Sequence, residues 1–252
     1  MNLKTPLISI ITIVYNDKEG LEKTIQSVLS QTYTNIEYIV IDGGSTDGSV
    51  SVIRKYESKI SKWVSEPDNG IFDAMNKGIK LATGEWLNMM NAGDFFYSND
   101  VLSNVFTSDI PNSAKYIYSD CEMRFPNGNK VIWKANEATG DVYHQASVYK
   151  KELHDEFGYY CAKKPLIMSD VLFFNLIPSV LYHHTSQIIA SYDMSGVSLE
   201  KISCRVQVTC LKYIFHKISL TELTKRVLKF YLKAVMPKKC WEVLKFFKRT
   251  VV

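Results

Sequence analysis

The sequence lacks the cysteine patterns of disulfide-rich and zinc-binding proteins. Its five cysteines are odd in number, are scattered along 252 residues and include no C-x-x-C pair. Disulfide frameworks and cysteine-based zinc sites both need paired or closely spaced cysteines. We therefore expect neither, and this cysteine usage fits a reducing cytoplasm.

Long hydrophobic runs, internal repeats and low-complexity tracts are also absent. A membrane-spanning helix needs roughly 18–20 consecutive apolar residues, and no stretch of the sequence reaches that length. The 46% hydrophobic and 22% charged fractions are ordinary for a globular protein. The length allows one sizeable domain, or a domain with an appendage.

Charge is distributed unevenly along the chain. The formal net charge is +4, but residues 201–252 contain thirteen Lys or Arg residues against two Glu residues. That segment therefore carries +11 and leaves −7 for the first 200 residues. An acidic body followed by a basic segment indicates two functional pieces, which we place at residues 1–198 and 199–252.

An alternating strand–helix pattern runs through the first 110 residues. The apolar stretches "ISIITIV" and "NIEYIVID" predict strands buried on both faces, and "KWVSEP" and "EWLNMM" predict two more. Between them we expect three helices, the second capped by Ser45, Thr46 or Asp47 and the third closed by Gly84. This order predicts an α/β fold with an open, mostly parallel sheet.

The pattern changes after residue 114. "KYIYSDCEMRF", the turn "PNGN" and "KVIWKA" predict a hairpin. A strand near "VYHQASVY" and a short helix near "SDVLFFNL" follow, and the last fifty residues predict basic amphipathic helices.

Polar clusters follow each of the four expected strands in the first half. In open parallel sheets, ligands bind beyond the carboxyl ends of the strands, and here those ends carry "YND", "DGG", "EPD" and "NAGD". Their convergence on one edge predicts a ligand site. Two readings of individual residues stay open: Asp94 holds a metal ion or is a solvated turn residue, and Asp42 binds ligand or only shapes a turn.

Four segments in order resemble the family-two GT-A glycosyltransferases, bacterial enzymes that build surface polysaccharides and lipid-linked oligosaccharides. They are "ISIITIVYND", "SVLSQTYTNIEYIVIDGGSTDGS", "EPDNGIFDAMNKGIKLATGEW" and "NAGD". The resemblance covers roughly residues 6–110 strongly and 140–200 more loosely. It implies a Rossmann-like nucleotide-binding sheet flanked by helices, with a nucleotide-sugar half at about 1–110, an acceptor half at about 111–198 and a basic helical tail at 199–252.

The resemblance also implies roles for individual residues. Asp94 would hold Mg²⁺ or Mn²⁺, with Asn91 at the first position of the family's Asp-x-Asp motif, and Asp170 would be the catalytic base. "SYDMSGVS" matches the loop that closes over donor and acceptor. The remaining donor-binding residues would be Thr12, Tyr15, Asp42 and Gly44 around the nucleoside, and Asp73, Asn76 and Lys77 beside the ribose and diphosphate.

Structural alternatives exist for several of these side chains. Asp170 opens an apolar helix and could serve as its N-cap. His144 and Gln145 could be a satisfied polar pair in the core. His183 and His184 are expected to be structural or exposed, with a third metal ligand as the alternative.

The function implied is an inverting transfer of a sugar from a nucleotide-sugar, expected to be a UDP-sugar, to a glycan or polyprenyl-linked acceptor in surface polysaccharide biosynthesis. A catalytically inactive nucleotide-sugar or membrane-binding module is the alternative, motivated by Asn91. A sugar-nucleotide pyrophosphorylase ranks lower, because "VYNDKEG" offers no glycine-rich, Arg-bearing loop after the first strand.

The tail combines apolar and basic residues. Leu223, Val227, Leu228, Tyr231 and Val235 form an expected apolar stripe beside four basic residues, and Trp241, Leu244 and Phe247 repeat this pattern beside five more. Such helices suit the surface of an anionic bilayer, so we expect a cytoplasmic protein peripheral to the inner face of the membrane. A helical lid on the core is the alternative, and no nucleic-acid-binding motif accompanies the basic residues.

Overall fold

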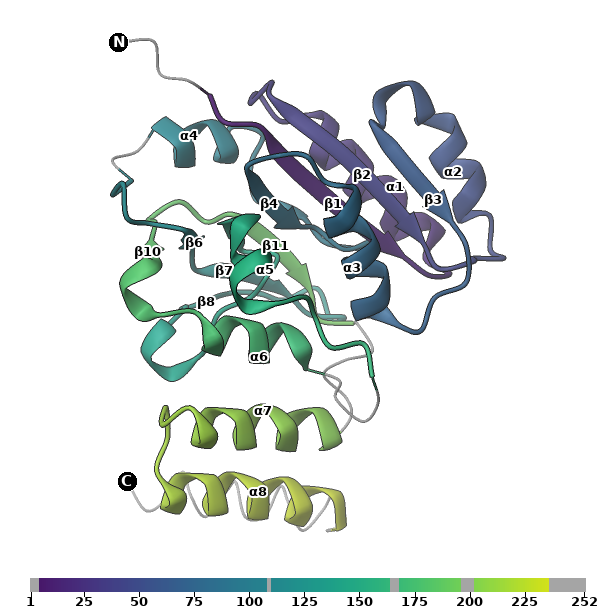
Figure 1. The fold of residues 1–252 in the computed structure, drawn as a ribbon. Helices are drawn as coiled ribbons and strands as arrows, with labels where there is room; N and C mark the ends of the chain where they lie inside the picture. The colour runs from purple at the N-terminus through teal and green to yellow at the C-terminus, as the bar shows by residue number, and fades with distance from the viewer. Residues whose placement is uncertain (1–4, 108–109, 164–167, 196–201, 236–252) are drawn as a thin grey trace. The chain divides into compact units, whose positions relative to one another are not determined.

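The computed structural model describes residues 5–107, 110–163, 168–195 and 202–235. The chain divides into two compact units, residues 1–195 and 196–252, whose ribbons are drawn in Figure 1. The first unit contains all the strands among the described residues, and the second contains two helices.

A seven-stranded sheet forms the centre of the first unit. Its order is β10-β6-β9-β4-β1-β2-β3, and all neighbours are parallel except β9, which runs antiparallel to both β4 and β6. The expected α/β class with a mostly parallel sheet is therefore confirmed. The strands are β1 (Ile8–Val14), β2 (Ile36–Asp42), β3 (Lys62–Ser65), β4 (Trp86–Met89), β6 (Tyr116–Tyr118), β9 (Ser147–Lys150) and β10 (Tyr182–His184).

Helices cover both faces of this sheet (Figure 1). Strand β1 is buried along its whole length, with Ile8 and Ile10 in one core cluster and Ile11 and Ile13 in the other. Successive side chains of a strand point to opposite faces, which explains the uniformly apolar sequence. One cluster includes residues of α1 (Lys18–Leu29), α2 (Ser49–Lys55) and α4 (Val101–Thr107), and the other includes residues of α3 (Ile71–Leu81), α5 (Glu152–Phe157) and α6 (Ser169–Leu176).

A four-stranded sheet, ordered β5-β11-β7-β8, completes the first unit. Its strands are β5 (Phe95–Phe96), β7 (Cys121–Arg124), β8 (Lys130–Trp133) and β11 (Ala190–Asp193). The expected hairpin exists between β7 and β8. However, "KYIYSDCEMRF" is not one strand, because the chain leaves the large sheet after Tyr118 and enters the small one at Cys121.

Two expected helix caps were wrong. Helix α3 ends at Leu81 with Ala82 as its C-cap, and Gly84 instead packs so closely that a Cβ there would lie 2.6 Å from the backbone nitrogen of Ser9. The N-cap of α2 is Gly48. Asp47 still accepts a 3.0 Å hydrogen bond from the Ser49 backbone N–H, so it supports the first turn without occupying the cap.

The second unit contains α7 (Ile202–Ile214) and α8 (Leu220–Val235), which pack together. Within the described part of the chain, no helix is long and apolar enough to span a membrane. The residues of the apolar stripe expected on α8 differ in exposure. Leu223 and Val227 are half-buried, whereas Leu228 and Tyr231 are exposed. The Val235 side chain and the pattern around Trp241, Leu244 and Phe247 lie outside what is described.

Candidate functional site

The carboxyl ends of β2, β1 and β4 form one continuous edge. The Gly43 backbone N–H donates to Val14 O and the Ala92 N–H donates to Ile13 O, so the loops after all three strands leave the sheet together. With strands about 4.8 Å apart, β2 and β4 are separated by roughly 10 Å. The expected convergence of polar clusters is therefore present in the fold.

Asp42 lies at the end of β2 and is fully buried. Its Oδ2 accepts hydrogen bonds from the Ser65 hydroxyl at 2.6 Å and from the Ser45 and Gly44 backbone N–H groups at 3.1 and 3.2 Å. Its Oδ1 accepts one long bond of 3.3 Å from Ser45. This carboxylate closes the turn and keeps acceptor capacity on Oδ1, because each carboxylate oxygen has two lone pairs.

Tyr15 and Gly44 lie beside Asp42 at the same edge. The Tyr15 side chain is 67% exposed, and one ring carbon lies 3.4 Å from where a Cβ on Gly43 would be. Gly44 has φ of +85° and backs onto Pro67, a conformation that glycine adopts at little cost. Together they leave an exposed aromatic ring over a glycine turn.

Other expected donor-binding residues have partners inside the protein. The Thr12 hydroxyl is buried against Tyr38 Oη at 3.0 Å. The Asn76 amide is bonded on both sides to the Tyr160 backbone, at 2.7 and 3.0 Å. Thr12 and Asn76 therefore have structural roles in this arrangement.

Asp73 lies in the first turn of α3 and Lys77 lies one turn further along the helix. The Lys77 ammonium is 2.8 Å from Glu66 and 3.8 Å from Asp73, and the Glu66 carboxylate raises the pKa of Lys77. Asp73 accepts a 3.0 Å hydrogen bond from the Asn69 backbone N–H. These contacts hold the positively charged Lys77 side chain beside the loop that follows β3.

Asp94 ends the turn after β4 and is only 3% exposed. Its Oδ1 accepts a 2.8 Å bond from the Asp193 N–H, and its Oδ2 accepts a 2.9 Å bond from the Gln145 amide. Burial raises the pKa of Asp94 to about 7, although these hydrogen bonds oppose the shift. The alternative of a solvated turn residue is excluded by this burial.

A second chain of contacts starts at Asn91 in the same turn. The amide nitrogen of Asn91 lies 3.1 Å from His144 Nε2, and His144 Nδ1 lies 2.9 Å from Asp170 Oδ2. Asn91 Oδ1 and Asp170 Oδ1 are both buried, and neither has a hydrogen-bond partner among the described residues. His144 and Gln145, consecutive in the chain, thus contact Asp170 and Asp94 respectively.

Asp170 lies in the first turn of α6 rather than at its cap, which is Met168. The N-cap alternative for Asp170 is therefore wrong. An acidic side chain in the first turn of a helix still interacts favourably with the unpaired N–H groups there. The structure brings Asp94 and Asp170 to neighbouring positions through residues 144 and 145, with Asp42 two strands away.

The side chains at this edge suit a hard divalent cation, which prefers oxygen ligands. A Cβ on Gly93, whose φ is +90°, would lie 3.5 Å from Asp17 Oδ2 and 3.6 Å from Asp193 Oδ2, so these carboxylates surround the turn that carries Asp94. Across the described ranges, no group of three or more Asp, Glu, His or Cys side chains could by itself hold a metal ion. A cation at this edge would therefore need phosphate and water as its remaining ligands, a mixed set of ligands that Mg²⁺ commonly has.

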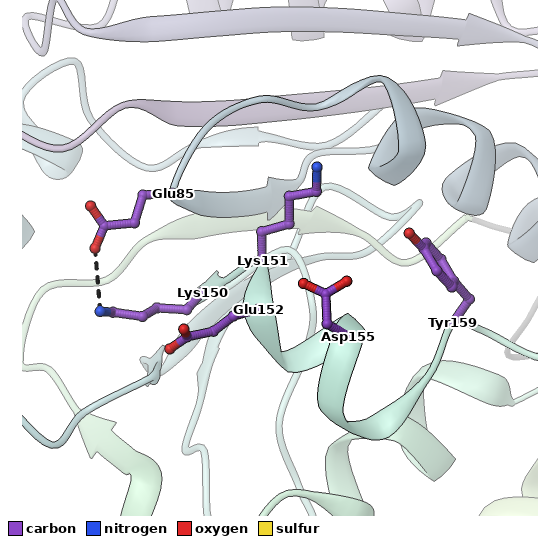
Figure 2. A pocket seen from close by; sticks show the side chains of 6 residues that line it. All are labelled: Glu85, Lys150, Lys151, Glu152, Asp155 and Tyr159. Carbon is purple, nitrogen blue, oxygen red and sulfur yellow. Dashed lines mark ion pairs between the residues drawn. The ribbon is translucent and has the colours of Figure 1, made fainter.

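Two other features do not contact these site residues in the described structure. His184, 3.5 Å from Asp120, is an exposed residue of β10. A surface hollow of about 430 Å³ lies at the opposite end of β4, beside Glu85, and Figure 2 shows Lys150 ion-paired with Glu85 there at 3.2 Å. Its other lining residues are Lys151, Glu152, Asp155 and Tyr159.

The sequence analysis missed three contributors to the candidate site. Gln145 and Asp193 bind the two oxygens of Asp94, and the Arg124 guanidinium donates to Gly93 O and lies 4.0 Å over the Phe95 ring. The short "HQ" pair was a usable signal for Gln145. Asp193 lies in the stretch "SYDMSGVS" that the resemblance had marked as a closing loop, but nothing in that stretch indicated a contact with Asp94, and residues 196–198 of it lie outside the described residues. No local pattern marks Arg124, because its contacts come from the small sheet.

Comparison with known families gives a direct match. The family model described as "Glycosyl transferase family 2" matches residues 9–162, more than half of the chain. An uncharacterized glycosyltransferase of Mycobacterium tuberculosis is 46% identical over 99 residues, which span 39% of this chain and 38% of that protein. A PGL/p-HBAD biosynthesis glycosyltransferase of Mycobacterium bovis is 27% identical over 210 residues, which span 77% of this chain and 79% of that protein.

Solved structures with the same fold include two complexes with nucleotide-sugars. A mannosyltransferase from Pyrobaculum calidifontis, in complex with GDP-Man and Mn²⁺, superposes with a TM-score of 0.68 at 16% identity, over 97% of this chain and 80% of that one. S. aureus TarS 1-349, in complex with UDP-GlcNAc, gives 0.66 at 16% identity, over 89% and 71%. At these identities the likeness shows the fold alone.

Proposed function

The chain belongs to glycosyl transferase family 2 and has the GT-A fold, and from this premise we propose that it is an inverting glycosyltransferase. It would transfer a sugar from a nucleotide-sugar, of which a UDP-sugar is our first choice, to a glycan or lipid-linked acceptor. The observation that carries the proposal is Asp170 Oδ1, which is buried near the Asp94 turn and has no hydrogen-bond partner in the described ranges.

Asp170 is proposed as the base. The acceptor hydroxyl oxygen forms the new bond to the anomeric carbon while the bond from that carbon to the phosphate oxygen breaks on the opposite face. The hydroxyl proton passes to Asp170 Oδ1, and the bonding electrons leave with the nucleoside diphosphate. A general base contributes roughly 10²–10⁴ in rate.

Asp94 is proposed as the protein ligand of Mg²⁺ or Mn²⁺. Such a cation, when bound, neutralises the negative charge of a diphosphate leaving group. Each Asp94 oxygen accepts one hydrogen bond and keeps a second lone pair. A nearby cation also favours the ionised form of a buried carboxylate, and the raised pKa of Asp94 shows that burial alone disfavours that form.

The edge formed by β1 and β2 is proposed as the nucleoside site. Tyr15 offers an exposed ring for stacking, Gly44 allows close approach of the backbone, and Asp42 Oδ1 has acceptor capacity for a base N–H. Lys77 and Asp73 are proposed to lie beside the ribose and diphosphate. Thr12 and Asn76 would support this site through Tyr38 and Tyr160 rather than bind the donor.

An anionic membrane surface is proposed as the partner of the basic tail. On α8, Leu228, Tyr231 and Leu232 are 60%, 55% and 43% exposed, and their i, i+3, i+4 spacing places them on one face. Lys225 and Lys229 are exposed close to that face. Each basic residue near an anionic surface contributes about 1 kcal/mol, which supports a cytoplasmic, peripheral location.

The test is turnover of defined donors. The full chain would be incubated with UDP-GlcNAc, other UDP-sugars and GDP-mannose in the presence of Mn²⁺, and nucleoside diphosphate release would be measured. We expect release from one donor and its loss on chelation. Binding of a donor with no release would favour the inactive-module alternative instead.

A further inference from the structure

We infer that His144 is a positioning residue for Asp170, and that it joins the Asn91–Asp94 turn to the group that receives the acceptor's proton. The inference rests on the proposed function, in which Asp170 is the base. It assigns a role to His144, for which the sequence analysis offered a polar pair with Gln145 in the core as the structural alternative. The argument begins with the two nitrogens of its ring.

The ring of His144 has a different partner on each side. Nε2 lies 3.1 Å from Asn91 Nδ2, and Nδ1 lies 2.9 Å from Asp170 Oδ2. An amide nitrogen can only donate a hydrogen bond, so Nε2 accepts and carries no proton. The ring proton is then on Nδ1 and is donated to Asp170, which fixes one tautomer of a neutral imidazole.

This contact distinguishes the two oxygens of Asp170. Oδ2 is held by the imidazole N–H, whereas Oδ1 is buried and no described residue gives it a hydrogen bond. A buried polar atom without a partner costs free energy, so a ligand hydroxyl that donates to Oδ1 is favoured there. The imidazole prevents the carboxylate from rotating Oδ1 away from that hydroxyl.

The same geometry argues against His144 as the base itself. Its unprotonated nitrogen, Nε2, already accepts from Asn91, and its other nitrogen carries the proton given to Asp170. The side chains of His144 and Asp170 are only 13% and 19% exposed, so solvent competes little with these bonds. Among the described residues, two acceptors of the triad Asn91–His144–Asp170 lack a partner, Asn91 Oδ1 and Asp170 Oδ1, and of these only the carboxylate oxygen is basic enough to take a proton.

Three substitutions separate the two contacts of the ring. In His144→Asn the amide nitrogen can replace Nδ1–H toward Asp170, in His144→Gln it lies nearer the place of Nε2, and His144→Ala removes both. With whichever of UDP-GlcNAc and GDP-mannose the wild type turns over with Mn²⁺, we expect His144→Ala and His144→Gln to lower kcat by up to about 100-fold. The donor KM should be little changed, and His144→Asn should recover part of the loss.

A double-mutant cycle tests whether His144 acts through Asp170. In an Asp170→Asn background, His144→Ala should cause little further loss of kcat, because interacting residues are not additive. A full additional loss in that background would overturn the inference, as would equal kcat values for wild type and His144→Ala.

The ring tautomer gives a readout that is independent of turnover. In ¹⁵N-labelled full-length protein, with the His144 signals assigned by their absence in His144→Asn, we expect a proton on Nδ1 and none on Nε2. Asp170→Asn should alter this tautomer. A proton on Nε2 in the wild type contradicts the inference even if a donor is turned over, whereas the expected tautomer without any turnover contradicts the proposed function alone.

Discussion

The Gln145 side-chain amide donates a 2.9 Å hydrogen bond to Asp94 Oδ2, although the two residues are 51 positions apart in the chain. Gln145 precedes β9, the antiparallel strand inserted beside β4. The contact therefore fixes the turn after β4 to the second half of the unit. Asp94 Oδ2 thus accepts its hydrogen bond from a side chain, whereas Asp94 Oδ1 accepts from the Asp193 backbone N–H.

Replacing Gln145 with Ala should destabilise the protein. Asp94 Oδ2 would lose its donor in a buried site, at a cost of roughly 1–3 kcal/mol in the free energy of unfolding. Gln26→Ala is the matched control, because its amide donates to Tyr56 Oη at an exposed position; we expect a change within about 0.5 kcal/mol. Denaturant unfolding measures the free energy of unfolding of both variants. Equal losses in Gln145→Ala and Gln26→Ala would contradict a stabilising role for the hydrogen bond from Gln145 to Asp94.

A second prediction concerns acid sensitivity through Glu37, a buried residue of β2. Burial raises the pKa of Glu37, but hydrogen bonds from Lys62, Ser9 and Thr83 outweigh it and lower the pKa to about 2. Because the folded pKa lies below the unfolded value of 4.5, the stabilisation is present above pH 4.5 and is lost as pH falls towards 2. A shift of this size corresponds to roughly 3 kcal/mol.

Unfolding free energies measured from pH 7 to pH 2 should therefore converge for wild type and Glu37→Gln. Lys62→Met removes the cation 2.7 Å from Glu37. It should raise the pKa of Glu37 in the folded protein towards the unfolded value, so that stability is lost over a narrower pH range. A constant difference between wild type and Glu37→Gln at every pH would show that Glu37 titrates equally in both states.

Removing the tail after Ser219 should weaken binding to anionic vesicles. The deletion takes away α8 with its exposed Leu228 and Tyr231, together with nine Lys or Arg residues. Co-sedimentation with phosphatidylserine-containing vesicles, at low and high salt, measures the effect, and phosphatidylcholine vesicles are the control. Unchanged partitioning of the truncated chain, folded by circular dichroism, would favour the lid alternative.

Much of the first half of the fold follows from local pattern. Strands buried on both faces have mostly apolar sequences. Asp42 is the last residue of β2 and Asn91 lies two residues after β4, so the edge of the sheet could be located. The break between Tyr118 and Cys121 could not, because "YIYSDCEM" continues to favour a strand. Asp120 there accepts hydrogen bonds from the backbone of Ala135 and from Lys134, which is a tertiary arrangement.

The connections between site residues were beyond local pattern for the same reason. His144 and Asp170 are 26 residues apart. They meet because His144 precedes β9, a strand of the large sheet, and α6 packs on the face of that sheet to which Tyr149 of β9 contributes. Asp193 reaches Asp94 across 99 residues by way of β11. Sequence reasoning supplied candidate carboxylates, and the fold supplied the side chains that orient them.

The measurement closest to the central claim compares turnover and donor binding in wild type and Asp170→Asn. With a donor that the wild type uses in the presence of Mn²⁺, the variant should lose roughly 10²–10⁴ in kcat, while thermal shifts show that donor still binding. Nucleotide release by Asp170→Asn at the wild-type rate would contradict the assignment of Asp170 as the base.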